Sequence, residues 1–295
     1  MKRFEYFAPT NISEALRLLD IYGDRAKVLA GGTDLLVQMK NNEINPNYLI
    51  DLKKIPELTG IHATSNEGLK LCPLTTISDV ELSKAIGENI PILSEAAKTI
   101  GSVQIRNRAT VGGNVCRAAP SADLVPALLV LDAQLKIQSF GTERIVELQD
   151  FFIGPGKTIL KYNEILKEVM IPPPPSFSAG AYLKYGPRQT MDLAVVGAAV
   201  FMAFDPINYI CKNAKIVLGS VAPTPLRARK AEKVLVGGKL TQAIVGEAAK
   251  IASEESSPIT DVYGLDWHKR DIVSVLVRRA ITEVLSRIRD HKNEA

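Results

Sequence analysis

The spacing of hydrophobic residues changes along the chain and predicts a mixture of short strands and helices. Apolar residues three or four positions apart indicate one buried face of a helix, whereas short apolar or alternating runs bounded by turn residues indicate strands. In the first part of the chain these patterns are short and are connected by glycine-rich stretches. The helices predicted there cover residues 11–19, 78–86, 91–100 and 123–131, and the strands cover residues 27–30, 48–52, 69–71, 134–138, 144–148 and 164–171.

The second part of the chain begins with strand patterns and ends with helical ones. Asp205-Pro206-Ile207-Asn208 supplies turn residues that would join two of the strands in a hairpin. The predicted strands cover residues 180–185, 195–204 and 210–218, and the predicted helices cover residues 227–235, 241–254 and 268–290. The last helix should bury a stripe that recurs every four residues and consists of Ile272, Leu276, Ala280, Val284 and Ile288.

Four successive prolines, Pro172 to Pro175, separate these two parts. Such a run cannot continue a helix or a central strand, and it forms a stiff, extended coil. We therefore expect an α+β protein with two domains. The first should cover residues 1–172 and the second residues 177–290, with residues 173–176 as the linker.

Composition and charge favour a globular protein. At 295 residues, of which 46% are hydrophobic and 23% charged, the chain can bury a core in each of two domains. The net charge is only +4, and basic residues between Lys269 and Arg289 alternate with apolar ones, which favours a solvated helix face over a nucleic-acid-binding patch. No apolar run approaches the ~18 residues of a membrane span, and the first six residues lack the apolar core of a signal peptide. A cytoplasmic protein is expected.

The three cysteines, Cys72, Cys116 and Cys211, lie far apart in the sequence, as do the three histidines. This scatter favours neither a disulfide framework nor a zinc or iron–sulfur site on this chain. Redox chemistry would therefore require an organic cofactor or a partner protein.

Two glycine pairs carry the candidate chemistry. Gly31-Gly32 follows a predicted strand and precedes Thr33, whereas Gly112-Gly113 lies just before Asn114. Glycine permits positive φ and close backbone approach, so that successive N–H groups can surround an anion, and Thr and Asn side chains add donors. The two segments together could bind both phosphates of a diphosphate. The alternative for each pair is a simple tight turn.

The common nucleotide-binding fingerprints are absent from the sequence. No Gly-x-Gly-x-x-Gly follows a strand, so a Rossmann fold has no support. Gly156-Lys157-Thr158 has the ending of a P-loop, but Phe151 occupies the position of its first glycine. A turn is the preferred interpretation of this stretch.

The two glycine segments, in this order, resemble the FAD-binding loops of the medium subunit of molybdenum hydroxylases, the family of the xanthine dehydrogenase and aerobic-type carbon monoxide dehydrogenase flavoproteins. The resemblance covers nearly the whole chain, although each motif alone is weak. It departs from the family at Cys72-Pro73, where Gly-Ala usually precedes Leu-Thr-Thr. The other matching stretches are residues 4–9, 74–76, 101–107, 119–124, 151–158, 164–166, 182–185 and 270–271.

The resemblance implies a two-part FAD-binding domain of the vanillyl-alcohol-oxidase type, followed by a small α+β domain with an antiparallel sheet and helices. It also implies the FAD-binding residues. They are Val28, Leu29, Ala30, Gly31, Gly32, Thr33, Asp34 and Leu35 in the first segment (residues 28–35), Thr110, Val111, Gly112, Gly113 and Asn114 in the second segment (residues 110–114), and Ile100, Asp123, Leu166 and Lys184 elsewhere.

Individual roles follow from the same resemblance. Asp123 matches an acidic residue that binds FAD hydroxyls, although it could instead cap the helix that begins at Leu124. Ile100 matches a position beside the flavin, but core packing is an equal alternative. Lys184 matches a lysine near the isoalloxazine ring, where a cation would stabilise reduced flavin, and its alternative is a surface lysine. The sequence does not decide whether Arg188 or Asp192 contacts the flavin.

The implied function is electron transfer. A large partner subunit with molybdopterin would oxidise the substrate, a small partner with [2Fe–2S] clusters would relay electrons, and FAD on this chain would pass them to an external acceptor. A dimer of heterotrimers is one arrangement of such a complex. Two other functions compete with this one, a stand-alone FAD-dependent oxidase or reductase and an assembly subunit without flavin. The sequence does not identify the substrate or the acceptor, which could be NAD⁺, a quinone, ferredoxin or oxygen.

Overall fold

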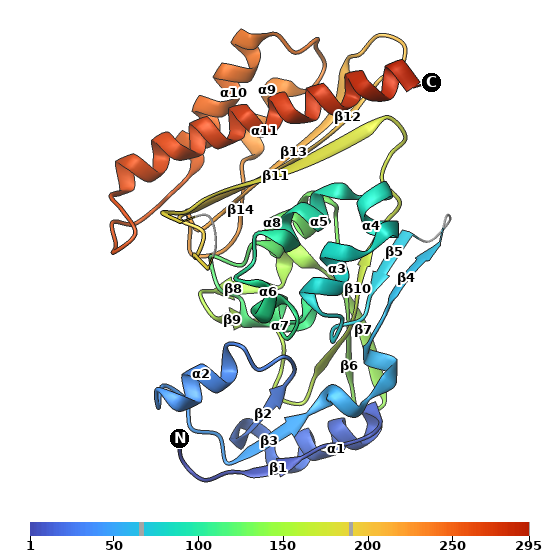
Figure 1. Cartoon of the computed structure of the whole chain (residues 1–295), viewed down its shortest axis with the longest axis vertical. Coiled ribbons are helices and arrows are strands. Elements are labelled where there is room, and N and C mark those ends of the chain that lie inside the picture. Colours follow the sequence, from blue (N-terminus) through green and yellow to red (C-terminus); the bar gives the residue numbers. More distant parts are fainter. Residues whose placement is uncertain (65–67, 189–190, 295) are drawn as a thin grey trace.

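The computed structural model describes residues 1–64, 68–188 and 191–294 and divides them into a lower, a middle and an upper part (Figure 1). The lower part is a small parallel sheet with the strand order β1-β3-β2. Asn11 caps the first helix, since its side chain accepts a hydrogen bond from the N–H of Glu14. The elements of this part are β1 (Glu5–Phe7), α1 (Ile12–Tyr22), β2 (Ala26–Leu29), α2 (Leu35–Lys40) and β3 (Tyr48–Asp51).

The middle part is an antiparallel sheet with the strand order β4-β5-β10-β6-β7, and Figure 1 shows helices α3–α8 on one side of it. Its strands are β4 (Ile61–Thr64), β5 (Gly68–Leu71), β6 (Gln134–Ser139), β7 (Thr142–Glu147) and β10 (Ile165–Ile171). Its helices are α3 (Ile77–Leu82), α4 (Lys84–Asn89), α5 (Pro91–Lys98), α6 (Val103–Arg106), α7 (Val111–Arg117) and α8 (Leu124–Val130). A two-stranded ribbon of β8 (Phe152–Gly154) and β9 (Lys157–Thr158) holds the turn at Gly156, as the sequence predicts.

The upper part is an antiparallel sheet with the strand order β11-β12-β13-β14. Helices α9–α11 cover one face, and α5 and α8 of the middle part cover the other (Figure 1). All nine residues of β12 are therefore buried, which explains their continuous apolar run. The elements are β11 (Ser178–Tyr185), β12 (Val196–Phe204), β13 (Cys211–Gly219), β14 (Leu226–Arg227), α9 (Arg229–Leu235), α10 (Gln242–Glu255) and α11 (Asp266–Glu294).

The predicted fold class is confirmed. The lower and middle parts together form the N-terminal unit, the upper part forms the C-terminal unit with an antiparallel sheet and helices, and the protein is α+β. The predicted hairpin is formed by β12 and β13, and the stripe on α11 packs into the core. One helix prediction is wrong. The chain breaks at Ser83 between α3 and α4, because the Ser83 side chain caps a new helix by accepting the N–H of Ile86.

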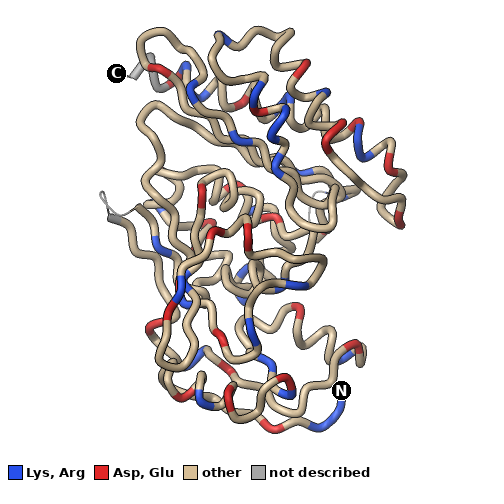
Figure 2. Tube along the Cα trace, turned by 180° about the vertical axis from the view of Figure 1, so that it is seen from behind, with Lys and Arg blue, Asp and Glu red and all other residues tan. Residues whose placement is uncertain are grey.

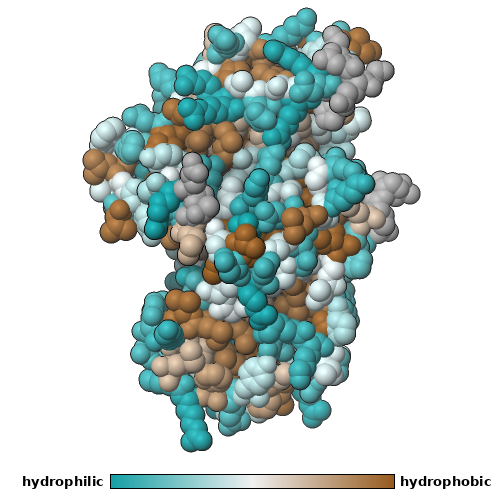
Figure 3. Space-filling model, viewed as in Figure 1, coloured by the Kyte–Doolittle hydropathy of each residue, from teal (hydrophilic) through white to brown (hydrophobic). Residues whose placement is uncertain are grey.

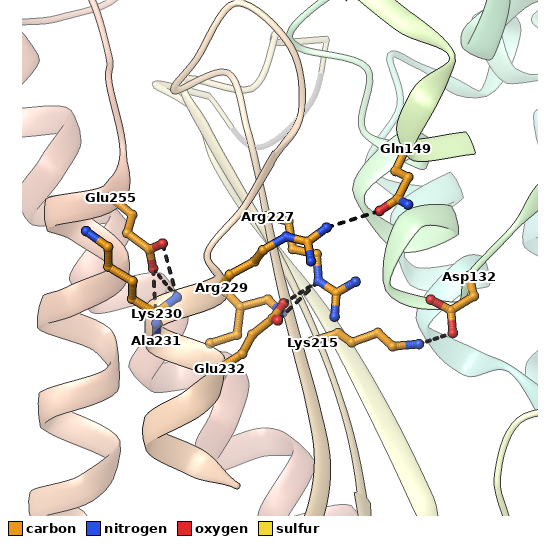
Figure 4. A network of polar contacts seen from close by, with 10 residues as sticks. Asp132, Gln149, Lys215, Arg227, Arg229, Lys230, Ala231, Glu232 and Glu255 are labelled. Carbon is orange, nitrogen blue, oxygen red and sulfur yellow. Dashed lines mark hydrogen bonds and ion pairs between the residues drawn. The ribbon is translucent and has the colours of Figure 1, made fainter. Parts of the chain in front are cut away.

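Polar contacts join the upper part to the middle part (Figure 4). The ammonium of Lys215 on β13 pairs with Asp132 at the end of α8, and Arg229 donates to Gln149. Glu232, which is buried, accepts hydrogen bonds from the backbone N–H of Ile216 and from Nε of Arg227. The Lys215–Asp132 and Arg229–Gln149 contacts fix the sheet against the middle part, whereas those of Glu232 join α9 to β13 and β14 within the upper part.

Charge is distributed without a strong bias over the molecule. Figure 2 shows basic residues over the whole trace, interspersed with acidic ones, and α11 carries both signs. Within the described part of the chain, no helix combines the length and the apolar character needed to cross a bilayer.

Candidate functional site

The two glycine segments lie directly against each other. A Cβ built on Gly31 would lie 2.0 Å from the carbonyl oxygen of Arg108 and 3.1 Å from Cα of Ala109, which stands just before the second segment. A second contact joins the same regions, because Nε of Arg117 at the end of α7 pairs with the carboxylate of Asp34. Only glycine fits at position 31, so the close approach of the segments depends on this residue.

The first segment exposes consecutive backbone donors. It leaves β2 after Leu29 and enters α2 at Leu35. Within the described part of the chain, the N–H groups of the four residues from Gly31 to Asp34 make no hydrogen bond. Gly32 adopts a positive φ of 78°, which bends the segment. Unpaired successive amides in such a bend form a concavity that binds anions.

The second segment differs from the expectation. Thr110 caps α7 by accepting a hydrogen bond from the N–H of Gly113 at 3.0 Å, and residues 111–114 form the first turn of this helix. The N–H of Val111 donates to the carbonyl of Thr75, and that of Gly112 donates to the carbonyl of Pro73. The prediction that this backbone offers free amides is therefore wrong for these three residues.

Gly112 is required for packing. A Cβ built on Gly112 would lie 2.6 Å from Cβ of Pro73 and 2.8 Å from the Pro73 carbonyl oxygen. The glycine thus lets the start of α7 sit against Cys72-Pro73, where the sequence departs from the family that it resembles. A ligand at the second segment would meet the side chains of Thr110 and Asn114 instead of the backbone N–H groups.

Asn114 carries an unpaired polar atom. Its Oδ1 is buried and has no hydrogen-bond partner within the described part of the chain. A buried acceptor without a donor is costly, and native proteins rarely keep one without a reason. The hydroxyl or amide donor of a bound molecule would remove this cost. The residues present therefore fit a ligand that combines an anionic group with polar groups beside it.

Asp123 and Lys184 meet across the two parts of the molecule. Nζ of Lys184 on β11 lies 2.8 Å from Oδ2 of Asp123, at the start of α8, and the Tyr182 hydroxyl donates to Oδ1 at 2.7 Å. The Asp123 side chain makes no capping bond to α8, so the cap interpretation is wrong. Burial raises the pKa of Asp123, whereas the charge of Lys184 opposes this rise.

The remaining predicted residues are largely internal. Ile100 lies in the core, and its carbonyl accepts a hydrogen bond from the Arg106 guanidinium at 3.1 Å. Leu166 is buried on β10 beside a register shift. Arg188 is exposed, and its N–H donates to the side chain of Asp192. The carbonyl of Asp192 in turn accepts a hydrogen bond from Lys184.

Sequence reasoning missed two residues of this region. Tyr182 has a strand environment rich in small apolar residues, so its hydroxyl gives no signal until the fold places Asp123 opposite. Arg117 lies far from Asp34 in the sequence, and no local pattern links them. Both contacts depend on tertiary structure.

These features define a class of protein: a two-domain chain whose paired segments fit a polar, anionic ligand. Residues 2–174 match the family model described as the FAD binding domain in molybdopterin dehydrogenase, and residues 181–284 match that of the CO dehydrogenase flavoprotein C-terminal domain. The chain belongs to this family of molybdenum hydroxylase flavoproteins, which confirms the resemblance seen in its sequence.

Relatives and solved structures agree with this membership. The chain is 32% identical to the 6-hydroxypseudooxynicotine dehydrogenase complex subunit alpha of Paenarthrobacter nicotinovorans, over 98% of this chain and 97% of the relative. It is 30% identical to a putative xanthine dehydrogenase FAD-binding subunit of Escherichia coli, over 95% and 96%. A chain of carbon monoxide dehydrogenase from Hydrogenophaga pseudoflava superimposes with a TM-score of 0.93 at 34% identity, over 97% of this chain and 98% of that one.

Proposed function

We propose that this chain is the FAD-binding, electron-transferring subunit of a molybdenum hydroxylase complex. The single observation that supports this most is the contact of Gly31 with Arg108, because it brings the two glycine segments together at one place. Bound FAD would supply the redox chemistry, since it can take up and release electrons singly or in pairs.

The residues of this chain would hold and orient the cofactor. The free N–H groups from Gly31 to Asp34 suit its diphosphate, and the unpaired Oδ1 of Asn114 suits a donor beside it. Asp123 and Lys184 neutralise each other's charge at the contact between the parts of the molecule. By resemblance the site includes residues 28–35 and 110–114 with Ile100, Asp123, Leu166 and Lys184.

The proposal extends to domains and partners. We propose a FAD-binding domain of residues 1–172, a linker of residues 173–176 and a C-terminal domain of residues 177–290, in a cytoplasmic complex. The partners would be a small [2Fe–2S] subunit and a large molybdopterin-binding subunit. Figure 3 shows apolar patches over the lower and middle parts of one face, and patches of this kind often mark protein contacts. Large apolar side chains with substantial exposure include Leu36, Val37, Val103, Ile153 and Met191.

The test is reconstitution of the purified chain with FAD, followed by addition of the two partner subunits. We expect one FAD per chain, read from the visible absorption of flavin. We also expect the hydroxylation substrate to reduce this flavin only when both partners are present. Reduction by an organic substrate without partners would identify a stand-alone flavin enzyme. A chain that binds no FAD would identify an assembly subunit.

A further inference from the structure

Two residues on one strand approach the same carboxylate. Tyr182 and Lys184 are two positions apart on β11, so their side chains leave the same face of the sheet. The Tyr182 hydroxyl donates to Oδ1 of Asp123 at 2.7 Å, and Nζ of Lys184 lies 2.8 Å from Oδ2. Tyr182 is 4% exposed and Asp123 is 6% exposed. Each carboxylate oxygen therefore has its own donor, away from water.

Lys184 has no remaining donor for a cofactor. Besides Asp123, its ammonium donates to the carbonyl of Thr99 at 3.0 Å and to the carbonyl of Asp192 at 2.9 Å. An ammonium has three N–H donors, and these contacts occupy all three. Lys184 thus ties together the end of α5, the start of α8 and the stretch that follows β11. Its influence on a cofactor acts through its charge and through the position of these segments.

Gly197 provides the room for the Tyr182 hydroxyl. It pairs with Lys184 across β11 and β12, and a Cβ built on it would lie 2.7 Å from the Tyr182 hydroxyl oxygen. The nearest ring carbons of Tyr182 would be 3.5 and 3.6 Å away, which is ordinary contact. Among the nearest atoms, only the Tyr182 hydroxyl oxygen would therefore clash with a side chain at position 197.

Other charged groups near β11 are paired elsewhere. Glu95 on α5 accepts the backbone N–H of Tyr182 at 3.3 Å, and its carboxylate is bound by Arg287 of α11 at 2.6 Å. Arg287 also donates to the carbonyl of Gly180 on the same strand. Glu95 thus holds the Tyr182 backbone while the Tyr182 hydroxyl faces Asp123.

We propose that Tyr182 is a positioning residue of the flavin site and that Gly197 makes this role possible. The hydroxyl holds the Asp123 carboxylate in one orientation and disperses its negative charge, and Asp123 in turn holds Lys184 against Thr99 and Asp192. The inference rests on the proposed function. Without the hydroxyl, more of the carboxylate charge acts on the flavin, so the reduced, more negative form is bound less tightly relative to the oxidised form.

The experiment compares Tyr182→Phe, Gly197→Ala and the double variant in the full chain loaded with FAD. Tyr162→Phe is the matched control, because Tyr162 is largely exposed. For Tyr182→Phe we expect FAD to stay bound and the reduction potential, measured above neutral pH, to fall. A tenfold change in the ratio of affinities for the two redox forms corresponds to about 30 mV. Tyr162→Phe should leave the potential unchanged.

The double variant separates positioning from general damage. Gly197→Ala alone should lower both the melting temperature and the potential, because its Cβ displaces the hydroxyl. In the double variant the hydroxyl is gone, so the melting temperature should recover toward that of Tyr182→Phe while the potential stays low. A wild-type potential in Tyr182→Phe, or no recovery in the double variant, would overturn the inference. Failure of the wild-type chain to bind FAD would instead overturn the proposed function.

Discussion

Gly31 sits where any side chain would collide with the carbonyl oxygen of Arg108. The Cβ-to-oxygen distance of 2.0 Å involves backbone on both sides, so a rotamer change cannot relieve it. The two segments of the candidate site are therefore held at a separation that only glycine permits. This relationship makes position 31 the most direct test of the site.

Gly31→Ala should separate the segments. We expect a loss of about 1–3 kcal/mol in the free energy of unfolding, as for other overpacked positions, and loss of FAD from the purified chain. Gly246→Ala is the control, because no atom lies within 4 Å of a Cβ there and the residue is inside α10. That variant should gain about 0.5–1 kcal/mol. Urea unfolding and flavin absorption measure both effects, and full flavin content in Gly31→Ala would contradict the assignment.

Lys184→Met should leave the Asp123 carboxylate buried without a cation. Breaking a buried ion pair in this way costs about 3–5 kcal/mol. The loss should show in urea unfolding of the FAD-free chain at neutral pH. Adding Asp123→Asn removes the stranded charge, so the double variant should be more stable than Lys184→Met alone. A double variant that is less stable would show that the ion pair is not the source of the cost.

The same variant has a pH dependence with a definite sign. Burial already raises the pKa of Asp123, and removal of Lys184 should raise it further. A carboxyl group with a raised pKa in the folded state binds a proton more tightly there than in the unfolded chain. Lys184→Met should therefore regain stability, relative to the wild type, as the pH falls from neutral toward the ordinary Asp range.

Regular patterns made much of the fold predictable. The stripe from Ile272 to Ile288 and the turn at Asp205 identify α11 and the β12–β13 hairpin, because burial on one face imposes a period on the sequence. The start of α7 could not be predicted. Val111-Gly112-Gly113 has poor helix propensity, and the turn is held by tertiary hydrogen bonds to the carbonyls of Thr75 and Pro73.

The sequence identified residues of the candidate site, but it did not predict which of them contact one another. Asp123 and Lys184 were each identified by resemblance, but no sequence feature indicates that they pair with each other. Tyr182 lies 59 positions from Asp123, and its hydroxyl bond depends on the packing of the upper sheet against α5 and α8. Long-range contacts of this kind are set by the tertiary arrangement, which local spacing does not encode.

Glu164 should contribute to stability in a pH-dependent way. Arg144 binds its carboxylate through two hydrogen bonds of 2.9 and 2.8 Å and lowers the pKa of Glu164. A lowered folded-state pKa means that this stability is present above the unfolded pKa and is lost as the pH falls through the folded one. Glu164→Gln should lower the free energy of unfolding by about 1.5–3 kcal/mol near neutral pH. On acidification, this variant should lose less of its stability than the wild type does. Urea unfolding at a series of acid pH values measures this loss. If the free energy of unfolding fell equally with pH in Glu164→Gln and in the wild type, the result would count against this role.

Asn114→Ala should separate ligand binding from stability. Its Oδ1 is buried without a partner, so removing the amide deletes an unpaired acceptor rather than an existing hydrogen bond. We expect the FAD-free chain to unfold within about 0.5 kcal/mol of the wild type. A lost hydrogen bond to FAD of about 1–1.5 kcal/mol should weaken binding roughly fivefold to tenfold.

Titration of the FAD-free chain with FAD, followed by fluorescence quenching, measures the affinity. The control is Asn107→Ala, since Asn107 accepts a hydrogen bond from the Ser78 hydroxyl at 2.6 Å. That variant should lose stability and keep its affinity for FAD. If Asn114→Ala instead loses stability and keeps its affinity, Oδ1 has a structural partner and does not face the flavin cofactor.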